Sequence, residues 1–159
     1  MGRKLASQLW KDFVDTDTEV CNQFECDSIA EIWDHHGEAA FRKKEVLVTC
    51  QSLARDEQVI ALGGGTLMQS AAREAIEHAP DTRRIYLYCE LQELDRRICG
   101  DQANAAARPD LTPLGGGMEE IKTVLAERDP VYRAVADKVF NVTNLDPDNA
   151  LHYLIKQCL

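Results

Sequence analysis

Apolar residues recur along this chain in two patterns, one typical of amphipathic helices and one typical of buried strands. At the start of the chain, Leu5 and Leu9 with the flanking Ala6 and Trp10 fall at helical spacing, which predicts a helix over residues 3–11. Short apolar runs that end in acids, glycines or polar residues predict strands. Four segments have this second pattern and are the predicted strands: FVDTD, QVIALGGG, RRIYLY and KVFNVT.

Helical patterns alternate with these strands. Ser28 followed by Glu31 forms a capping box that predicts the start of the helix IAEIWDHH, and Gly37 suits its C-terminal stop. Further along, Asp129-Pro130 is expected to halt the helix MEEIKTVLAER, because proline has no amide hydrogen and clashes with the preceding turn. The other predicted helices are EAAFRKKEVLVTCQSLAR, residues 69–79, LQELDRRIC, VYRAVAD and DPDNALHYLIKQCL.

Two segments have little apolar periodicity. Residues 18–27 are polar and predict an irregular connection. Residues 100–117, GDQANAAARPDLTPLGGG, contain mainly small residues with two prolines and four glycines. This second composition predicts a long mobile loop, of the kind that often forms a lid over a site.

The alternation of strands and helices predicts the fold class. It is typical of right-handed βαβ units, and therefore of a three-layer α/β fold in which a parallel sheet has helices on both faces. A length of 159 residues suits a single domain with a sizeable core. In such sheets the site lies at the carboxyl ends of the strands, and two of these ends here are DTD and GGG.

Composition and charge narrow the possible partners. The chain is 45% hydrophobic and 28% charged, as in ordinary globular proteins. Its formal net charge of −9 argues against general nucleic-acid binding, for which a basic face is expected. A local basic pocket for an anionic small molecule remains compatible with this charge. No apolar run is long enough to span a membrane, and no signal or transit peptide is visible.

The cysteines and histidines do not predict a metal site. No C-x-x-C pair occurs, and no histidine is spaced as a zinc partner. His35-His36 has no plausible third ligand, and a solvated helix end is the favoured interpretation. Several cysteines lie in apolar runs, so we expect reduced thiols in a reducing compartment. The six cysteines are Cys21, Cys26, Cys50, Cys89, Cys99 and Cys158.

Asp15 and Asp17 end the first predicted strand. Alternation places two acids spaced by two on the same side of an extended segment. One acid is then able to hold a metal ion or its water while the other accepts a hydroxyl proton. The alternative is a polar strand exit with two solvated acids.

Gly63, Gly64 and Gly65 follow the second predicted strand directly. A triple glycine allows the backbone to approach a ligand closely and to present amide groups to an anion. The alternative is a tight strand-to-helix turn, although one glycine usually suffices for such a turn.

Three arginines are candidates for binding an anion. Arg42 lies in a predicted helix between Glu38 and Glu45, which on its own suggests an exposed ladder of ion pairs. Arg128 is expected at a helix C-terminus, where the dipole favours a cation in any case. Arg108 lies in the predicted lid. Together they offer a bidentate clamp for a carboxylate and a lid charge for a phosphate.

Five segments occur in order along the chain and together carry a family resemblance: FVDTD, SIAEIWDHHGEAAFRKKE, VIALGGGTL, ARPDLTPL and ERDPVYRAVAD. The combination of F-V-D-x-D, G-E-x-x-F-R-x-x-E, G-G-G and E-R-x-P-x-Y is much more specific than any one part. With these motifs almost the whole chain resembles shikimate kinase, a P-loop phosphotransferase of the nucleoside-monophosphate-kinase type. The resemblance implies a kinase that phosphorylates the 3-hydroxyl of shikimate with ATP in aromatic amino acid biosynthesis.

The resemblance also implies an acceptor site. Asp17 matches the acid that contacts the shikimate hydroxyls beside the phosphoryl acceptor, which gives it a catalytic role. Arg42 and Arg128 match the pair that holds the shikimate carboxylate, and Gly63–Gly65 match the glycines that line this pocket. The resemblance places a shikimate-binding helical region at about residues 18–56.

On the nucleotide side, the resemblance implies that ATP binds with Mg²⁺. Asp15 matches the acid near the magnesium ion, and Arg108 matches the catalytic lid arginine that closes over the ATP phosphates. Arg97 is the candidate for the adenine side. The lid is expected at about residues 100–117. Shikimate and ATP are the expected partners, without nucleic acid or membrane, for a cytoplasmic enzyme that acts as a monomer.

One family motif is absent from the sequence. In the family, GRKLA follows a phosphate loop G-x-x-x-x-G-K-[ST] and the first, central strand, and no such loop occurs in this chain. We expect the N-terminus as written to be incomplete, and the strands on either side of the missing strand to lie about 10 Å apart. The alternatives are a catalytically inactive shikimate-binding protein and a kinase of another small polyol acid, such as gluconate.

Overall fold

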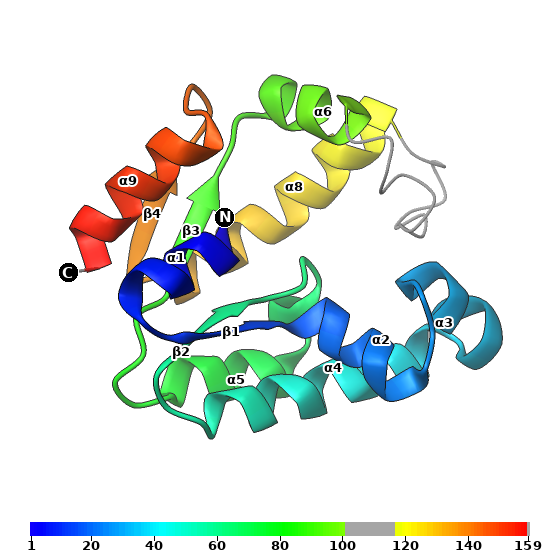
Figure 1. Cartoon of the computed structure of the whole chain (residues 1–159). Helices are drawn as coiled ribbons and strands as arrows, with labels where there is room; N and C mark the ends of the chain where they lie inside the picture. Colours follow the sequence, from blue (N-terminus) through cyan, green and yellow to red (C-terminus); the bar gives the residue numbers. More distant parts are fainter. Residues whose placement is uncertain (101–116, 159) are drawn as a thin grey trace.

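The computed structural model of the chain describes residues 1–100 and 117–158 (Figure 1). Strands and helices alternate along it, as the apolar pattern predicts. The strands are β1 (Asp12–Asp15), β2 (Gln58–Ala61), β3 (Ile85–Tyr88) and β4 (Lys138–Asn141). The helices are α1 (Gly2–Leu9), α2 (Thr16–Phe24), α3 (Ile29–His36), α4 (Glu38–Leu53), the 3₁₀ helix η1 (Thr66–Met68), α5 (Ser70–His78), α6 (Leu91–Gly100), α8 (Gly117–Val135) and α9 (Pro147–Cys158).

The strands form two separate parallel pairs. β1 pairs with β2, with Val14 opposite Ile60, and β3 pairs with β4, with Leu87 opposite Phe140. Within residues 1–100 and 117–158, no strand joins the two pairs. The predicted α/β class with parallel strands is therefore confirmed.

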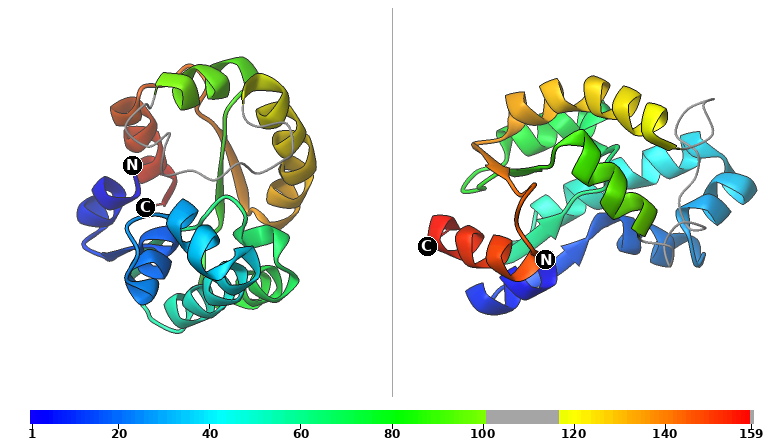
Figure 2. Two further views of the ribbon diagram at one scale, coloured as in Figure 1. Left: turned by 90° about the vertical axis from the view of Figure 1, so that its right-hand side faces the viewer. Right: turned by 90° about the horizontal axis from the view of Figure 1, so that it is seen from above.

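Helices at two places join the halves of the molecule. α1 packs against β1, β2 and α9, and Lys4 Nζ lies 2.6 Å from Asp148 Oδ1. On the other side, α8 packs against η1 and α5. Figure 1 and the left view of Figure 2 show β3 and β4 between α8 and α9. The first half of the chain therefore meets the second half at α8 as well as at α1.

Each half has its own apolar core. The first core lies where α2, α3 and α4 meet, and the second lies between β3, β4 and α9. The buried residues of the first are Val20, Ile32, Phe41 and Val48. Those of the second are Cys89, Val142 and Ala150.

The first predicted strand is shorter than expected. β1 ends at Asp15, and α2 occupies most of the segment predicted to be irregular. The cause is local, because Asp15 Oδ1 accepts a hydrogen bond of 3.1 Å from the Thr18 amide and so caps α2. Asp17 therefore lies in the first turn of a helix, and the prediction that both acids share one side of an extended segment is wrong.

The predicted helix stop at Asp129-Pro130 is also wrong. α8 continues through Pro130 to Val135, so Arg128 lies inside a helix and the helix-dipole explanation for its position does not apply. A proline inside a helix removes one backbone hydrogen bond, and packing must offset the loss. One such contact is a 3.0 Å hydrogen bond that Tyr86 on β3 donates to Asp129 Oδ1.

The capping box that opens α3 is confirmed. Ser28 Oγ accepts from the Glu31 amide at 3.2 Å, and Glu31 Oε2 accepts from the Asp27 amide at 2.8 Å. Gly37 ends the helix with a φ of 80°, a conformation that favours glycine. No helix in the described part of the chain is long and apolar enough to cross a membrane.

Candidate active site at the carboxyl ends of β1 and β2

The glycine loop that follows β2 is tied to the start of α2. The Gly63 amide donates a 2.9 Å hydrogen bond to Thr16 Oγ1, and that hydroxyl donates to the Ala61 carbonyl at 3.3 Å. Thr16 is fully buried. The carboxyl ends of β1 and β2 thus meet at one edge, as parallel pairing requires, and bring their loops into contact.

Two of the glycines are required by close approach of charged side chains. A Cβ atom on Gly63 would collide with Asp17 Oδ1, and one on Gly65 would collide with Arg42 Nη1. Neither glycine has a positive φ, so the lack of a side chain is what matters here. The glycine loop therefore allows Asp17 and Arg42 to lie directly against the backbone.

Arg128 reaches the same loop from α8. Its Nη1 donates a 2.8 Å hydrogen bond to the Gly64 carbonyl, and Tyr132 OH donates to the same oxygen. Burial raises the pKa of Tyr132, which keeps its hydroxyl a donor. The sequence analysis assigned no role to Tyr132. Its spacing of four residues from Arg128 on one helix was the signal that both face the same way.

Arg42 belongs to a buried network and not to an exposed ladder. Its Nη1 lies 3.0 Å from Glu45 Oε2, and its Nε lies 3.1 Å from Glu38 Oε1. The Glu45 side chain is only 1% exposed, and its Oε1 accepts a 2.8 Å hydrogen bond from Thr66 Oγ1. Thr66 on η1 thus fixes the Glu45 carboxylate, and Glu45 in turn holds the Arg42 guanidinium beside the glycine loop.

Asp17 is the acid with a shifted pKa in this cluster. Burial raises the pKa of its carboxyl to about 6, the negative charges of Glu45 and Asp15 add to the rise, and Arg42 opposes it. An acid whose pKa lies near the working pH is suited to accept a proton in catalysis. Asp17 therefore has a proton affinity that suits a general base.

Asp15 lies beside this cluster with part of its carboxylate engaged. Its Oδ1 caps α2, whereas Oδ2 has no hydrogen-bond donor within residues 1–100 and 117–158. Carboxylate oxygens are the ligands that Mg²⁺ uses in proteins. The carboxylate thus fits a magnesium ligand without losing its capping hydrogen bond.

The structure does not bring Arg97 to the glycine loop. Its Nε lies 2.7 Å from Glu93 Oε1 on α6. Its Nη2 donates to three backbone carbonyls in the connection between β4 and α9, those of Val142, Thr143 and Leu145. These contacts anchor that connection. Arg108 and the predicted lid lie outside the described residues.

The cluster can bind a small anionic polyol. Guanidinium groups reach the glycine loop from two helices, and a guanidinium binds a carboxylate through two parallel hydrogen bonds. A carboxylate, that of Asp17, lies on the same loop and can accept a hydrogen bond from a ligand hydroxyl. Asp17, Arg42, Gly63–Gly65 and Arg128, predicted from the sequence as a set, are adjacent in space.

Comparisons with known proteins converge on one family. The family model described as shikimate kinase matches residues 1–159. A shikimate kinase of Rhodopirellula baltica is 33% identical over 98% of this chain and 81% of its own length. One of Chromohalobacter salexigens is 30% identical over 99% and 83%. A solved shikimate kinase of Acinetobacter baumannii, in complex with shikimate, has a TM-score of 0.82 at 28% identity over 99% of this chain and 81% of its own.

Proposed function

The chain belongs to the shikimate kinase family, and we propose that the cluster around Gly63–Gly65 is its shikimate site. As a member of this family the chain is a transferase: it phosphorylates the 3-hydroxyl of shikimate with ATP, a step of aromatic amino acid biosynthesis. The observation that carries the proposed site is the convergence of Asp17, Arg42 and Arg128 on the glycine loop.

In the proposed site, the two arginines hold the shikimate carboxylate. Arg42 is oriented by Glu45 before any ligand binds, and Arg128 is oriented by the Gly64 carbonyl. A clamp held in this way loses little side-chain entropy when the carboxylate arrives. The glycine loop leaves the ring of shikimate room to lie close to the backbone.

Asp17 acts on the acceptor hydroxyl in this proposal. Its carboxylate accepts the hydrogen bond of the 3-hydroxyl and orients that oxygen towards the γ-phosphorus of ATP. As the new O–P bond forms, the bond from the γ-phosphorus to the β–γ bridging oxygen breaks and ADP leaves, while Asp17 takes the hydroxyl proton. The raised pKa supports this role, because a carboxylate with pKa about 6 is a stronger base than an exposed aspartate and is still ionised at neutral pH. Positioning and charge neutralisation supply most of the catalysis in phosphoryl transfer.

The nucleotide side of the proposal rests on fewer residues. Asp15 is the proposed ligand of Mg²⁺ or of its bound water, through the carboxylate oxygen that does not cap α2. Mg²⁺, when bound, neutralises the charge that develops on the transferred phosphoryl group. Arg108 in the lid stays the proposed contact of the ATP phosphates. Arg97 stays a prediction for the adenine side.

We further propose that the enzyme acts as a monomer in the cytoplasm. The proposed site is built from α2, α4, α8 and the glycine loop of one chain, so it needs no residue from a second copy. Free thiols suit a reducing compartment. Sedimentation velocity and subcellular fractionation test these two points.

Calorimetric titration with shikimate tests the proposed site. The chain is expected to bind shikimate and to bind gluconate at least tenfold more weakly, because gluconate lacks the ring. Arg42→Lys keeps a cation beside Glu45 but removes the planar fork, so it should weaken shikimate binding about tenfold or more. Lys43→Arg, on the solvent side of α4, is the matched control. Unchanged affinity in Arg42→Lys contradicts the clamp.

A further inference from the structure

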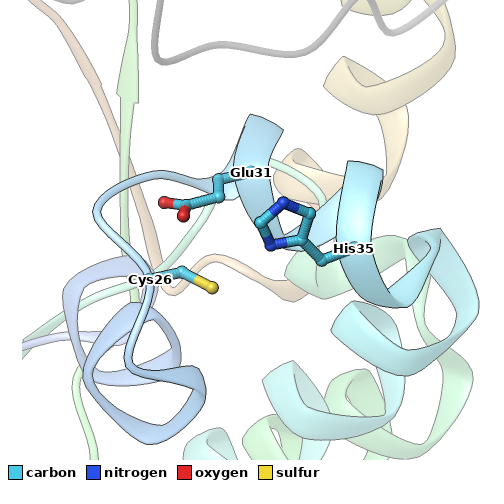
Figure 3. Close-up of side chains that lie close together, drawn as sticks. All are labelled: Cys26, Glu31 and His35. Atoms are coloured by element: carbon cyan, nitrogen blue, oxygen red, sulfur yellow. The ribbon is translucent and has the colours of Figure 1, made fainter.

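Three side chains of types that bind transition metals meet outside the proposed shikimate site. The Cys26 thiol, the Glu31 carboxylate and the His35 imidazole have ligand atoms that all lie within 4.8 Å of one another (Figure 3). Glu31 and His35 are one helical turn apart on α3, and Cys26 lies in the connection that precedes this helix. No third ligand for His35 was expected from the sequence, because Cys26 lies beyond the N-cap of α3 and has no fixed spacing to His35.

The backbone around the three residues is fixed by caps at both ends of the connection. Glu25 ends α2 in the left-handed conformation, and the Cys26 amide donates a 3.1 Å hydrogen bond to the Cys21 carbonyl. Ser28 then caps α3, and Glu31 Oε2 accepts from the Asp27 amide. Cys26 and the first turns of α3 are thus held at a set separation before any ion binds.

The ligand atoms are accessible to an ion. Cys26 and Glu31 are half-buried, and His35 is exposed. Glu31 keeps Oε1 without a donor in the described part of the chain. The Cys26 thiol donates a 3.5 Å hydrogen bond to the Phe24 carbonyl, which leaves the sulfur lone pairs open to an ion. The carboxylates of Glu31 and Asp27 both place negative charge near the Cys26 thiol, which favours a cation there.

From this arrangement we propose that Cys26, Glu31 and His35 form a zinc site, with water as the fourth ligand. Sulfur, imidazole nitrogen and carboxylate oxygen are the three ligand types that proteins use for Zn²⁺, and the set is too soft for Mg²⁺. A tetrahedral zinc needs these ligand atoms about 3.3–3.6 Å apart, so the side chains must close by up to about 1.5 Å. The exposed ring of His35 has room for that movement.

The bound ion connects α3 to the end of α2. α3 also carries Trp33, whose ring lies 5.6 Å from the guanidinium carbon of Arg42. Zinc therefore stabilises the helix that flanks the proposed carboxylate clamp, although it takes no part in the chemistry. The proposed role of the ion is to hold these two segments together, and its loss is measurable without an activity assay.

Cobalt substitution tests the site directly. The full chain titrated with Co²⁺ is expected to bind one ion and to show a thiolate-to-cobalt charge-transfer band with the visible bands of a tetrahedral centre. Cys26→Ser should remove the charge-transfer band, whereas Cys50→Ser, at an exposed cysteine on α4, should keep it. Absence of the band in the unmodified chain, or its persistence in Cys26→Ser, overturns the proposal.

Substitutions at the neighbouring residues His35 and His36 supply a second test, and both side chains are exposed, unlike Cys26. His35→Gln should weaken Zn²⁺ binding at least tenfold in competition with a chromophoric chelator, and His36→Gln should change it by less than twofold. Zn²⁺ should also raise the Tm of the unmodified chain and of His36→Gln but not that of His35→Gln. Equal Zn²⁺ affinities of the two variants contradict the proposal, because only His35 faces Cys26 and Glu31.

Discussion

The two strand pairs use charged residues in different ways. Next to β1 and β2, the Arg42–Glu45 pair is buried, with side chains 17% and 1% exposed. Next to β3 and β4, the charged pairs are more exposed: the Arg84 and Asp137 side chains are 25% and 42% exposed, and the Arg96 side chain is 72% exposed in its contact with Glu93. Surface pairs contribute little to stability, whereas buried charges cost desolvation energy that a hydrophobic residue would not. A buried charge network at strand ends therefore indicates function, and the surface pairs indicate local anchoring.

Loss of Glu45 should have the largest effect on stability. Glu45→Ala leaves the Arg42 guanidinium without its buried partner and the Thr66 hydroxyl without its acceptor, so the free energy of unfolding should fall by about 3 kcal/mol. Urea denaturation followed by circular dichroism measures the change. Glu38→Ala, at the exposed partner of the same arginine, is the control and should cost much less. Equal losses would mean that burial does not distinguish the two partners.

The raised pKa of Asp17 should have the next largest effect on the free energy of unfolding. The native state binds this proton more tightly than the unfolded chain, so the free energy of unfolding should fall as pH rises from about 4 to about 6 and then level off. Asp17→Asn removes this dependence and should raise the stability at pH 7.5 by about 2 kcal/mol. Urea denaturation midpoints of the unmodified chain and of Asp17→Asn, measured at a series of pH values, test this prediction.

Asp15→Asn is the control for that prediction. Asparagine keeps the oxygen that caps α2, so the variant should retain the fall in stability between pH 4 and pH 6. If Asp15→Asn abolishes the fall and Asp17→Asn preserves it, the assignment of the titrating group is wrong.

Asp17→Asn should also lower kcat far more than it lowers shikimate affinity, since the amide cannot accept the proton.

A substitution in the glycine loop should have a smaller effect, on the affinity for shikimate. Gly65→Ala forces the Arg42 guanidinium to move, so shikimate affinity should fall about tenfold, equivalent to about 1.4 kcal/mol. Gly100→Ala places its Cβ in open space and should leave affinity unchanged. Isothermal titration of both variants compares them. Retained affinity in Gly65→Ala would show that the close approach of Arg42 is not needed.

Removal of a surface charge from the β3–β4 half should have the smallest effect. Arg96→Ala breaks an exposed contact, while Glu93 keeps its second partner Arg97. We expect no resolvable change in the urea midpoint or in shikimate affinity. If Arg96→Ala lowered the free energy of unfolding as much as Glu45→Ala, the exposed and buried charged pairs would not differ in their contribution to stability.

The sequence predicted the four strands because each depends on a short-range pattern of apolar residues. Parallel pairing brings strand ends together, which is why FVDTD and GGG met as expected. The family motifs predicted that Arg42 and Arg128 lie near the glycine loop, and both contact it in the structure. Their expected environments were wrong, because Glu45 is buried beside η1 and Arg128 lies inside a continuous helix. Those environments depend on tertiary packing, which spacing along one helix does not report.

Other errors had equally specific causes. The alternation of apolar and polar residues was read through Asp17, but an N-cap hydrogen bond from Thr18 to Asp15 started a helix there. The Cys26, Glu31 and His35 cluster was missed because a capped connection, and not a fixed spacing, brings the thiol to α3. In both cases a hydrogen bond that caps a helix determines the local structure, and the pattern of apolar residues does not report such a bond.

The shikimate affinity of two arginine variants on α8 tests the proposed site most directly. Arg128 donates to the Gly64 carbonyl, whereas Arg133, on the same helix, is paired with Asp129. Neither change leaves a buried charge unpaired, so both variants should fold. We predict that Arg128→Ala weakens shikimate binding by about 10- to 100-fold and that Arg133→Ala changes it by less than about twofold. Equal affinities in the two variants would contradict the proposal that the glycine loop and its arginines form the shikimate site.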